Sequence, residues 1–259
     1  MPALLTITIL SALAVLMPSQ PTQSPPDQSL RQPSPQSVLD WALKAHGGRE
    51  AHDRVTSRKS RGTYTQSDDS FEADVYLFEK RPALRRREIL LTNGELVVEV
   101  VTADAAWTEN NGTTRRASPL RETQVRRDAV FDLLTDWNTF YDKAEIAPPE
   151  TIDGHLAHHV RLIVGDGHTL DLFFDTQTHR LIAQRERVAI DAERDYLRTV
   201  AFSDFRLFDG LLYPTTVKMT LGEGENARTI SYRWSRIEHN TRLPRNAFRE
   251  PPGLAQPTP

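Results

Sequence analysis

The chain has no cysteine among its 259 residues. Disulfide bonds, thiolate metal sites and cysteine nucleophiles are therefore excluded, and so is the acyl attachment that bacterial lipoproteins carry on a cysteine. The chain also lacks the G-x-S-x-G, G-x-x-x-x-G-K-[ST], G-x-G-x-x-G and H-E-x-x-H motifs. Without them, no nucleophile elbow, phosphate-binding loop, dinucleotide fingerprint or zinc-protease helix can be assigned. We expect no catalytic residue and no cofactor.

The sequence also lacks an excess of charge of one sign. It has 32 Lys and Arg residues against 35 Asp and Glu residues, which gives a formal net charge of −3. Proteins that attract nucleic acid or anionic membranes through their overall field usually carry a basic surplus. We therefore expect no nucleic-acid partner.

The N-terminus is apolar and uncharged over residues 1–17, and Pro18 ends this run. About 15 apolar residues match the hydrophobic region of a secretory signal peptide and are short for a bilayer span. We predict a signal peptide at residues 1–24 and a periplasmic or other extracytoplasmic location. An uncleaved anchor helix is the alternative.

Segments rich in Pro, Gln and Ser flank the rest of the chain, at residues 25–35 and 251–259. Such segments bury too little apolar surface to offset the entropy that ordering would cost. They predict a disordered tether and a disordered tail. Between them, residues 36–250 are predicted to form a single domain, which is long enough to build its own core.

Two helices are predicted in this domain. Ser34-Pro35 supplies an N-cap and a first-turn proline, and Gly47-Gly48 supplies the stop of the first helix. The second helix is expected to begin at Ser118-Pro119 and to run as one long amphipathic element. Its apolar stripe consists of Val130, Leu133, Leu134, Trp137 and Tyr141.

Much of the remaining chain alternates between apolar and polar residues, the period of a half-buried strand. Asn93-Gly94 lies between two such stretches and is a strong hairpin signal. Similar turn residues recur at Asn110-Asn111-Gly112, Asp153-Gly154, Gly165-Asp166-Gly167, Asp209-Gly210 and Gly222-Glu223-Gly224. Regularly spaced strands joined by tight turns predict an antiparallel meander rather than a parallel α/β sheet.

Two clusters of polar side chains leave alternatives open. His155, His158 and His159 could contribute ligands to a metal-dependent hydrolase, but we favour surface histidines and expect no metal. Arg85 and Arg87 share one face of a predicted strand. They either face solvent or lie inside, where they would need a carboxylate or a ligand headgroup beside them.

Several segments together resemble one family. Phe202–Pro214 (FSDFRLFDGLLYP) resembles the "sDyR.vdGl.yP" stretch of bacterial exported proteins of the LolA/LolB-like superfamily, which includes the outer-membrane lipoprotein-sorting carriers. Ala45-His46-Gly47-Gly48 is similar to the end of that family's first helix. Asp153-Gly154 with Leu172–Asp175 resembles its "vdG … lyfD" hairpin, and Ile237–Pro244 resembles its "i..N..lp" ending. The Pro-rich tether sets this chain apart from the sorting carriers.

The resemblance implies an α+β fold: a single curved antiparallel β-sheet of about 11 strands, a half-barrel covered on its concave face by a few helices. It also implies an apolar cavity that holds acyl chains. We therefore predict a monomeric extracytoplasmic carrier or binding protein for a lipid or a lipoprotein acyl chain, with lipoproteins or envelope proteins as further partners. The alternatives are an envelope scaffold with a filled core and the metal-dependent hydrolase. The expected cavity liners are Tyr76, Phe78, Trp107, Phe131, Leu134, Trp137, Phe173 and Trp234.

Overall fold

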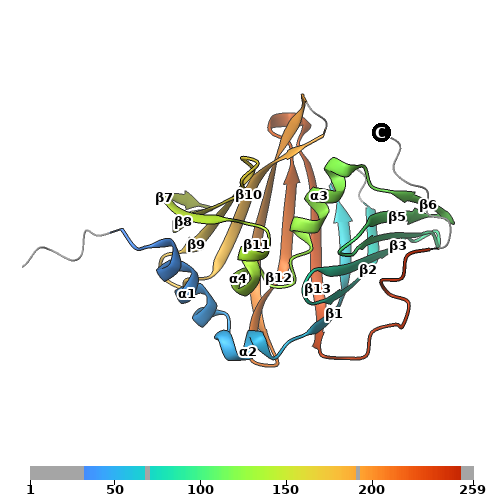
Figure 1. Cartoon of the computed structure of the whole chain (residues 1–259), viewed down its shortest axis with the longest axis horizontal. Coiled ribbons are helices and arrows are strands. Elements are labelled where there is room, and N and C mark those ends of the chain that lie inside the picture. Colours follow the sequence, from blue (N-terminus) through green and yellow to red (C-terminus); the bar gives the residue numbers. More distant parts are fainter. Residues whose placement is uncertain (1–31, 68–70, 191–192, 252–259) are drawn as a thin grey trace, which may run out of the picture. The chain divides into compact units, whose positions relative to one another are not determined.

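One antiparallel sheet dominates the domain (Figure 1). The computed structural model describes residues 32–67, 71–190 and 193–251, and in these residues the sheet has 13 strands. The predicted α+β, antiparallel architecture is confirmed, with two strands more than expected. The predicted signal peptide, most of the tether and all but the first residue of the tail lie outside the described residues. From Pro33 onward, the described residues belong to one unit.

The first half of the sheet is a meander that runs from the centre to one edge. It contains β1 (Ser57–Gln66), β2 (Phe71–Lys80), β3 (Leu84–Leu90), β4 (Leu96–Val101), β5 (Ala106–Asn110) and β6 (Thr113–Arg116). The second half starts at the opposite edge and returns to the centre. It contains β7 (Lys143–Ile152), β8 (His155–Ile163), β9 (Thr169–Asp175), β10 (Leu181–Ala189), β11 (Asp195–Phe208), β12 (Leu211–Leu221) and β13 (Arg228–His239).

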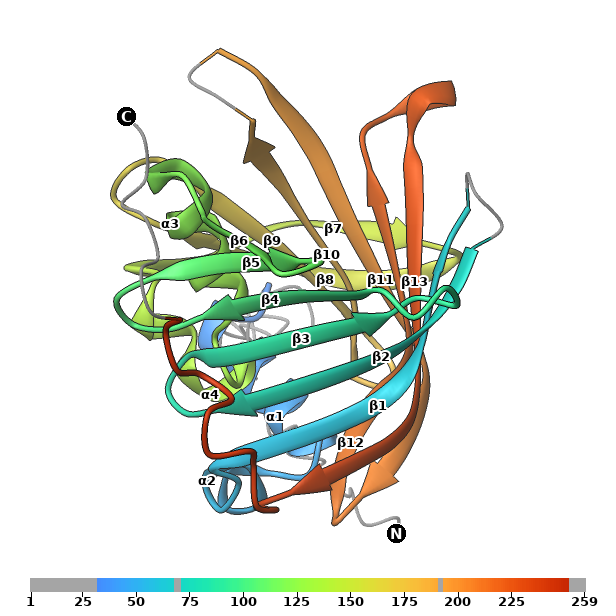
Figure 2. The same cartoon turned by 90° about the vertical axis from the view of Figure 1, so that its right-hand side faces the viewer.

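The two halves join where β13 pairs with β1, with Tyr232 opposite Tyr64. The strand order is therefore β6-β5-β4-β3-β2-β1-β13-β12-β11-β10-β9-β8-β7, and β6 and β7 are the two edges. The sheet curves around the helices without closing (Figures 1 and 2). All six predicted turn segments lie between consecutive antiparallel strands, as expected.

The first helix, α1 (Pro35–Ala45), begins and ends as predicted. The Ser34 hydroxyl accepts a hydrogen bond from the Ser37 amide at 3.1 Å. At the other end, the Gly48 amide donates to the Leu43 carbonyl at 2.8 Å, and Gly47 has a φ of +122°. This is the Schellman arrangement, in which a residue with positive φ satisfies the last carbonyls of the helix. A short helix, α2 (Arg49–Asp53), follows directly.

The second helix is not one long element, and this prediction is wrong. The chain forms α3 (Pro119–Asp128), then α4 (Leu133–Asp136) and a 3₁₀ turn, η2 (Trp137–Thr139). The break has a cause outside the helix: the Phe131 amide donates to the Pro82 carbonyl at 3.1 Å. The Asp132 carboxylate then caps α4 by accepting from the Leu134 amide at 3.1 Å.

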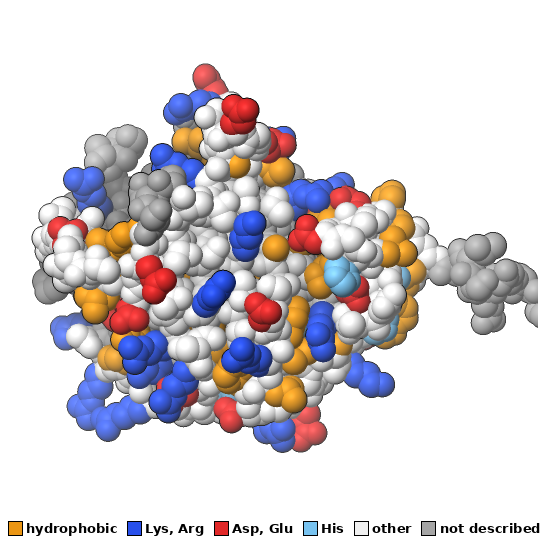
Figure 3. All heavy atoms as spheres, turned by 180° about the vertical axis from the view of Figure 1, so that it is seen from behind, with side chains coloured by type: hydrophobic (Ala, Val, Ile, Leu, Met, Phe, Trp, Pro, Cys, Tyr) orange, Lys and Arg blue, Asp and Glu red, His pale blue; other side chains and the backbone are white. Residues whose placement is uncertain are grey.

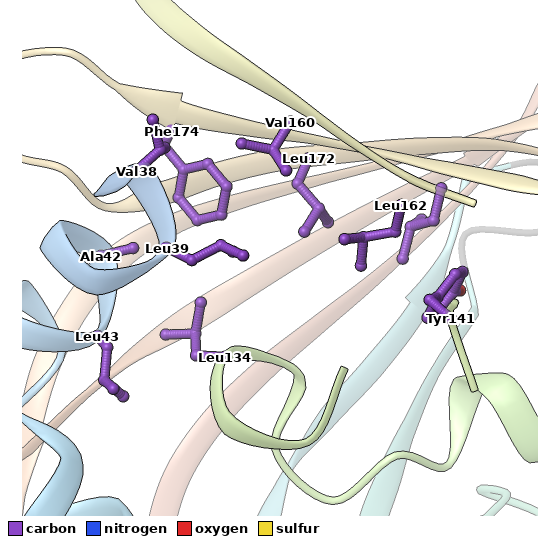
Figure 4. Packing of buried hydrophobic residues seen from close by; sticks show 11 residues of the cluster. Val38, Leu39, Ala42, Leu43, Leu134, Tyr141, Val160, Leu162, Leu172 and Phe174 are labelled. Carbon is purple, nitrogen blue, oxygen red and sulfur yellow. The ribbon is translucent and has the colours of Figure 1, made fainter. Parts of the chain in front are cut away.

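The main core lies between the helices and the second half of the sheet (Figure 4). Side chains of α1 and α4 meet the inward rows of β8 and β9 in one cluster. Its buried members are Val38, Leu39, Ala42, Leu43, Leu134, Tyr141, Val160, Leu162, Leu170, Leu172 and Phe174. Trp137 and Phe140 pack against this cluster, so the apolar stripe reaches the core although the helix is broken. None of the described helices is long and apolar enough to cross a membrane.

The opposite, outer face of the sheet is covered in part by the segment that follows β13, which runs back across β1–β4 (Figure 2). Phe248 of this segment packs on a cluster of Val98, Val100, Ala105 and Trp107. Elsewhere, the face seen from behind carries basic and acidic side chains interspersed with one another (Figure 3).

Candidate functional site

Two cavities lie between the inner face of the sheet and the helices. Alternation along β11–β13 directs Val200, Phe202, Val217 and Tyr232 to this side. The first cavity has a volume of about 290 Å³ and the second about 300 Å³. Both are lined by Asp128, Gln184 and Phe202, so they adjoin one another. Each has the size of a small ligand pocket.

The first cavity is bounded by the segment between α3 and α4 and by the middle strands. Its apolar wall is formed by Val130, Phe131, Leu133, Leu134, Leu170, Leu181, Phe202, Leu212 and Pro214. Its floor is ionic. Arg58 Nε donates to Glu79 Oε2 at 2.6 Å, and the Arg58 guanidinium lies 5.1 Å from the Tyr213 ring centroid. A ligand in this cavity would contact apolar side chains on one side and the Arg58–Glu79 ion pair on the other.

Asp132 connects further charged side chains at this end of the cavity. Its carboxylate is hydrogen-bonded to His52 Nδ1, and Arg81 Nη2 lies 3.8 Å away. Burial alone would raise the pKa of Asp132, but the His52 hydrogen bond and the charges of Arg58 and Arg81 outweigh it and lower the pKa. A His–Asp pair can act as a base, yet no Ser or Thr is among the described residues that line this cavity. The pair instead fixes the break between α3 and α4.

The second cavity has two chemically different walls. Strands β11–β13 supply mainly apolar residues, Val200, Val217, Met219, Leu221 and Ile230, together with Tyr196, Arg198 and Tyr232. The facing wall, from β3, β4 and α3, supplies Arg85, Arg87, Arg121, Glu99 and Asp128. An interior of this kind can accommodate a molecule with an apolar part and a polar part.

A third cavity, of about 470 Å³, lies on the outer face, between the β7–β8 turn, the β9–β10 turn and β12. It is larger than either interior cavity and its exposed lining is mainly apolar, although Asp153, His155 and Lys218 also line it. Phe202 also borders it. The interior cavities combine apolar walls with cover from the helices, and we take them as the candidate site for an apolar ligand.

The two segments that carry the family resemblance pack against each other. His46 Nδ1 donates to the Leu212 carbonyl at 2.9 Å, and the Leu212 amide donates to the His46 carbonyl at 3.0 Å. A Cβ atom on Gly47 would lie 2.7 Å from the Gly210 carbonyl oxygen. The helix end therefore needs glycine to dock on the β11–β12 turn, which gives these motifs a structural role.

The eight predicted liners divide between the two faces of the sheet. Phe131 and Leu134 line the first cavity. Trp137 packs on the adjoining core, and Trp234 stacks on Tyr232, which lines the second cavity, with ring centroids 5.7 Å apart. The other four point to the outer face and away from both cavities: Tyr76, Phe78, Trp107 and Phe173.

The three clustered histidines do not converge. His158 contacts the ring of Trp41 on α1, with centroids 5.8 Å apart, whereas His159 packs on Phe173 at 4.6 Å on the outer face. His155 instead lies 3.2 Å from Asp175. Among the described residues, no group of three or more His, Asp or Glu side chains is placed to hold a metal ion.

Several interior residues were not predicted from sequence, among them Gln184, Phe202, Met219 and Ile230. Alternation within Tyr196–Leu207 separates Val200 and Phe202 from Ala201 and Ser203. This alternation does not indicate which of the two sets faces the helices. Of the two positions considered for Arg85 and Arg87, the structure shows the inner one: both side chains point inward and share the Glu99 carboxylate.

Three solved structures share the architecture. A LolA superfamily protein from Nitrosomonas europaea aligns with a TM-score of 0.60 at 14% identity, over 85% of this chain and 99% of its own. A putative outer membrane lipoprotein-sorting protein domain from Vibrio parahaemolyticus aligns with a TM-score of 0.57 at 13% identity, over 83% and 97%. A DUF1329 family protein from Desulfovibrio piger aligns with a TM-score of 0.56 at 14% identity, over 82% and 96%.

No protein-family model and no curated protein matches the sequence. The structural likeness covers most of this chain and nearly all of each solved chain, and at these identities it establishes the fold. The domain has a LolA-like fold: an open antiparallel sheet that curves around helices, with cavities between the two. The family resemblance seen in the sequence is confirmed at the level of the fold.

Proposed function

We propose that the protein is an extracytoplasmic carrier or binding protein that holds the acyl chain of a lipid or lipoprotein between its curved sheet and its helices. The observation that carries this proposal is the pair of adjoining cavities on the inner face, which meet at Phe202. An acyl chain placed there would be removed from water at roughly 25 cal/mol per Å² of buried area. The predicted signal peptide supports an extracytoplasmic location and remains a prediction.

The two cavities favour a carrier over the alternative of a scaffold with a filled core. A scaffold of that kind would pack its interior with side chains and display apolar surface for partners. Here the inner face leaves a cavity beside the apolar side chains of β11–β13. The main packed core lies elsewhere, between α1 and strands β8 and β9. Lipoproteins and envelope proteins are proposed as sources or recipients of the ligand.

A fluorescent fatty acid, dansylundecanoic acid, tests the proposal. We expect its emission to rise on binding and oleic acid to displace it. Phe202→Glu should weaken binding at least about tenfold, because it replaces an apolar ring by a charged carboxylate where the two cavities meet. Met219→Glu should weaken binding through the second cavity alone.

Thr220→Glu is the matched control, since Thr220 neighbours Met219 on β12 and points to the other face. It should bind like the unmodified protein. Equal affinity in all four proteins, with unchanged circular dichroism spectra, would refute the location of the ligand. Absence of binding to every protein would refute the proposed function itself.

A further inference from the structure

Three arginines surround one carboxylate at the wall of the second cavity. Arg85 Nη2 lies 3.2 Å from Glu99 Oε1, and Arg87 Nη2 lies 3.3 Å from Glu99 Oε2. Arg121 Nη2, from α3, lies 3.7 Å from the same oxygen. Arg85 and Arg87 alternate with outward-facing Arg86 on β3, so β3 contributes two inward guanidinium groups.

This arginine trio has more positive charge than its partner neutralises. Burial would raise the pKa of Glu99, but Arg87, Arg85 and Arg121 together lower it, so Glu99 is ionised and offsets one of three charges. The neighbouring Arg198 pairs with two carboxylates, Asp128 at 2.8 Å and Glu186 at 3.1 Å, and Asp128 also attracts Arg85 and Arg121. The four arginines and three carboxylates together therefore leave one positive charge in excess beside the cavity.

The trio also has hydrogen-bond donors to spare. A guanidinium carries five N–H groups. Arg87 donates to the Tyr232 hydroxyl at 2.7 Å and to Glu99. In the described part of the chain, the Arg121 side chain makes only the 3.7 Å ion pair, which is longer than a hydrogen bond, and it is 44% exposed. Open donors of this kind suit the paired oxygens of a phosphate or a carboxylate.

The facing wall of the same cavity is largely apolar, with Val200, Met219 and Ile230, although β11 also places Arg198 there. We propose that the second cavity binds the anionic headgroup of an amphiphile, with Arg87 and Arg121 as its donors. Glu99 holds the guanidinium groups in place. The apolar part of the ligand runs along β11–β13 to Phe202 and the first cavity. This inference rests on the proposed function and specifies the ligand class as anionic amphiphiles.

Three twelve-carbon probes, used below their micelle concentrations, test the headgroup by isothermal titration calorimetry: dodecyl phosphate, dodecyltrimethylammonium and dodecanol. We expect dodecyl phosphate to bind about tenfold more tightly than either of the others. Arg121→Gln should remove most of that preference and leave dodecanol binding unchanged. Because Arg121 is half-exposed, this variant should fold even if Arg87→Gln does not.

Arg86→Gln is the matched control. Arg86 adjoins Arg87 but points to the outer face, where it pairs with Glu88 at 2.6 Å. It should keep the full preference for dodecyl phosphate. Inorganic phosphate serves as a further probe, and binding as tight as that of dodecyl phosphate would refute an amphiphile.

The outcomes separate the two proposals. Equal affinity for all three twelve-carbon probes would overturn the headgroup site while leaving the acyl-chain cavity intact. If no probe binds, the carrier function fails, and the headgroup inference fails with it. If Arg86→Gln reduced the preference for dodecyl phosphate as strongly as Arg121→Gln, the preference would come from the overall charge of the protein rather than from the arginine trio.

Discussion

His46 links the end of α1 to two strands and must stay uncharged to do so. Its Nδ1 donates to the Leu212 carbonyl, and its Nε2 accepts from the Leu181 amide at 3.4 Å. Protonation would place a second N–H against that amide. Burial lowers the pKa of His46 from 6.5, and the nearby charges of His52 and Arg180 add to this effect, against Leu212 and Asp132, which raise it.

This arrangement predicts acid-sensitive stability. A folded-state pKa below the unfolded value means that the stabilisation is fully present above about pH 6.5 and is lost as the pH falls through the folded pKa. We therefore expect the urea concentration at the midpoint of unfolding to decrease as the pH is lowered from about 7.5 to about 5. His158 and His239, whose pKa values are also lowered, contribute to this decrease with the same sign.

His46→Gln should flatten this decline, because an amide can donate and accept but does not titrate in this range. Exposed His155 provides the control, and His155→Gln should leave the decline as it is. Parallel pH profiles for His46→Gln and the unmodified protein would show that His46 does not carry the effect.

At the scale of elements, the segment after β13 closes part of the outer face. Phe248 covers Trp107, which is 3% exposed, and the Ala247 carbonyl accepts from Arg86 Nη1 at 3.4 Å. Phe248→Ala should lower the free energy of unfolding by about 1 to 3 kcal/mol, less than for a fully buried phenylalanine. Trp107 emission should shift to longer wavelength.

Phe248→Leu keeps an apolar side chain and should recover most of both effects, measured by urea unfolding and tryptophan fluorescence. A Phe248→Ala protein with unchanged stability and emission would mean that this segment does not cover the sheet in solution.

Turn chemistry made the hairpins predictable, whereas the sequence did not reveal the long-range contacts. Strand β1, which is largely polar, and strand β7 were not predicted. β7 carries Pro148 and Pro149 at a register shift, which an edge strand tolerates because one side needs no ladder. The break before α4 depends on Asp132 meeting His52, 80 positions earlier in the chain.

The site was predictable only in part, for a related reason. β2 alternates cleanly, but its aromatic residues divide between the faces: Tyr76 and Phe78 face outward, whereas Phe71 faces in with Val75. The outward aromatics are covered by cations, with Lys59 Nζ 5.9 Å from the Phe78 ring and Arg61 5.5 Å from the Tyr76 ring. Residue size therefore does not identify the inner face, and strand register is needed to do so.

At the scale of the whole domain, the open sheet keeps space beside its middle strands because α1 and α4 pack mainly on β8 and β9. Across that space lie Arg85 and Arg87 of β3, on the other half of the sheet, and Arg121 of α3. The pairing of β1 with β13 thus brings an apolar wall and a basic wall to one interior. This juxtaposition supports a ligand with both an acyl chain and a charged end.

Native mass spectrometry of tag-free protein, expressed with its N-terminal segment and recovered from the periplasm, tests the central claim most directly. We predict a population heavier by the mass of a phospholipid, fatty acid or acylated peptide, identified by extraction and absent from Phe202→Glu. Protein that arrives without an adduct, and stays empty when lipids are offered, would contradict the carrier function and favour a scaffold.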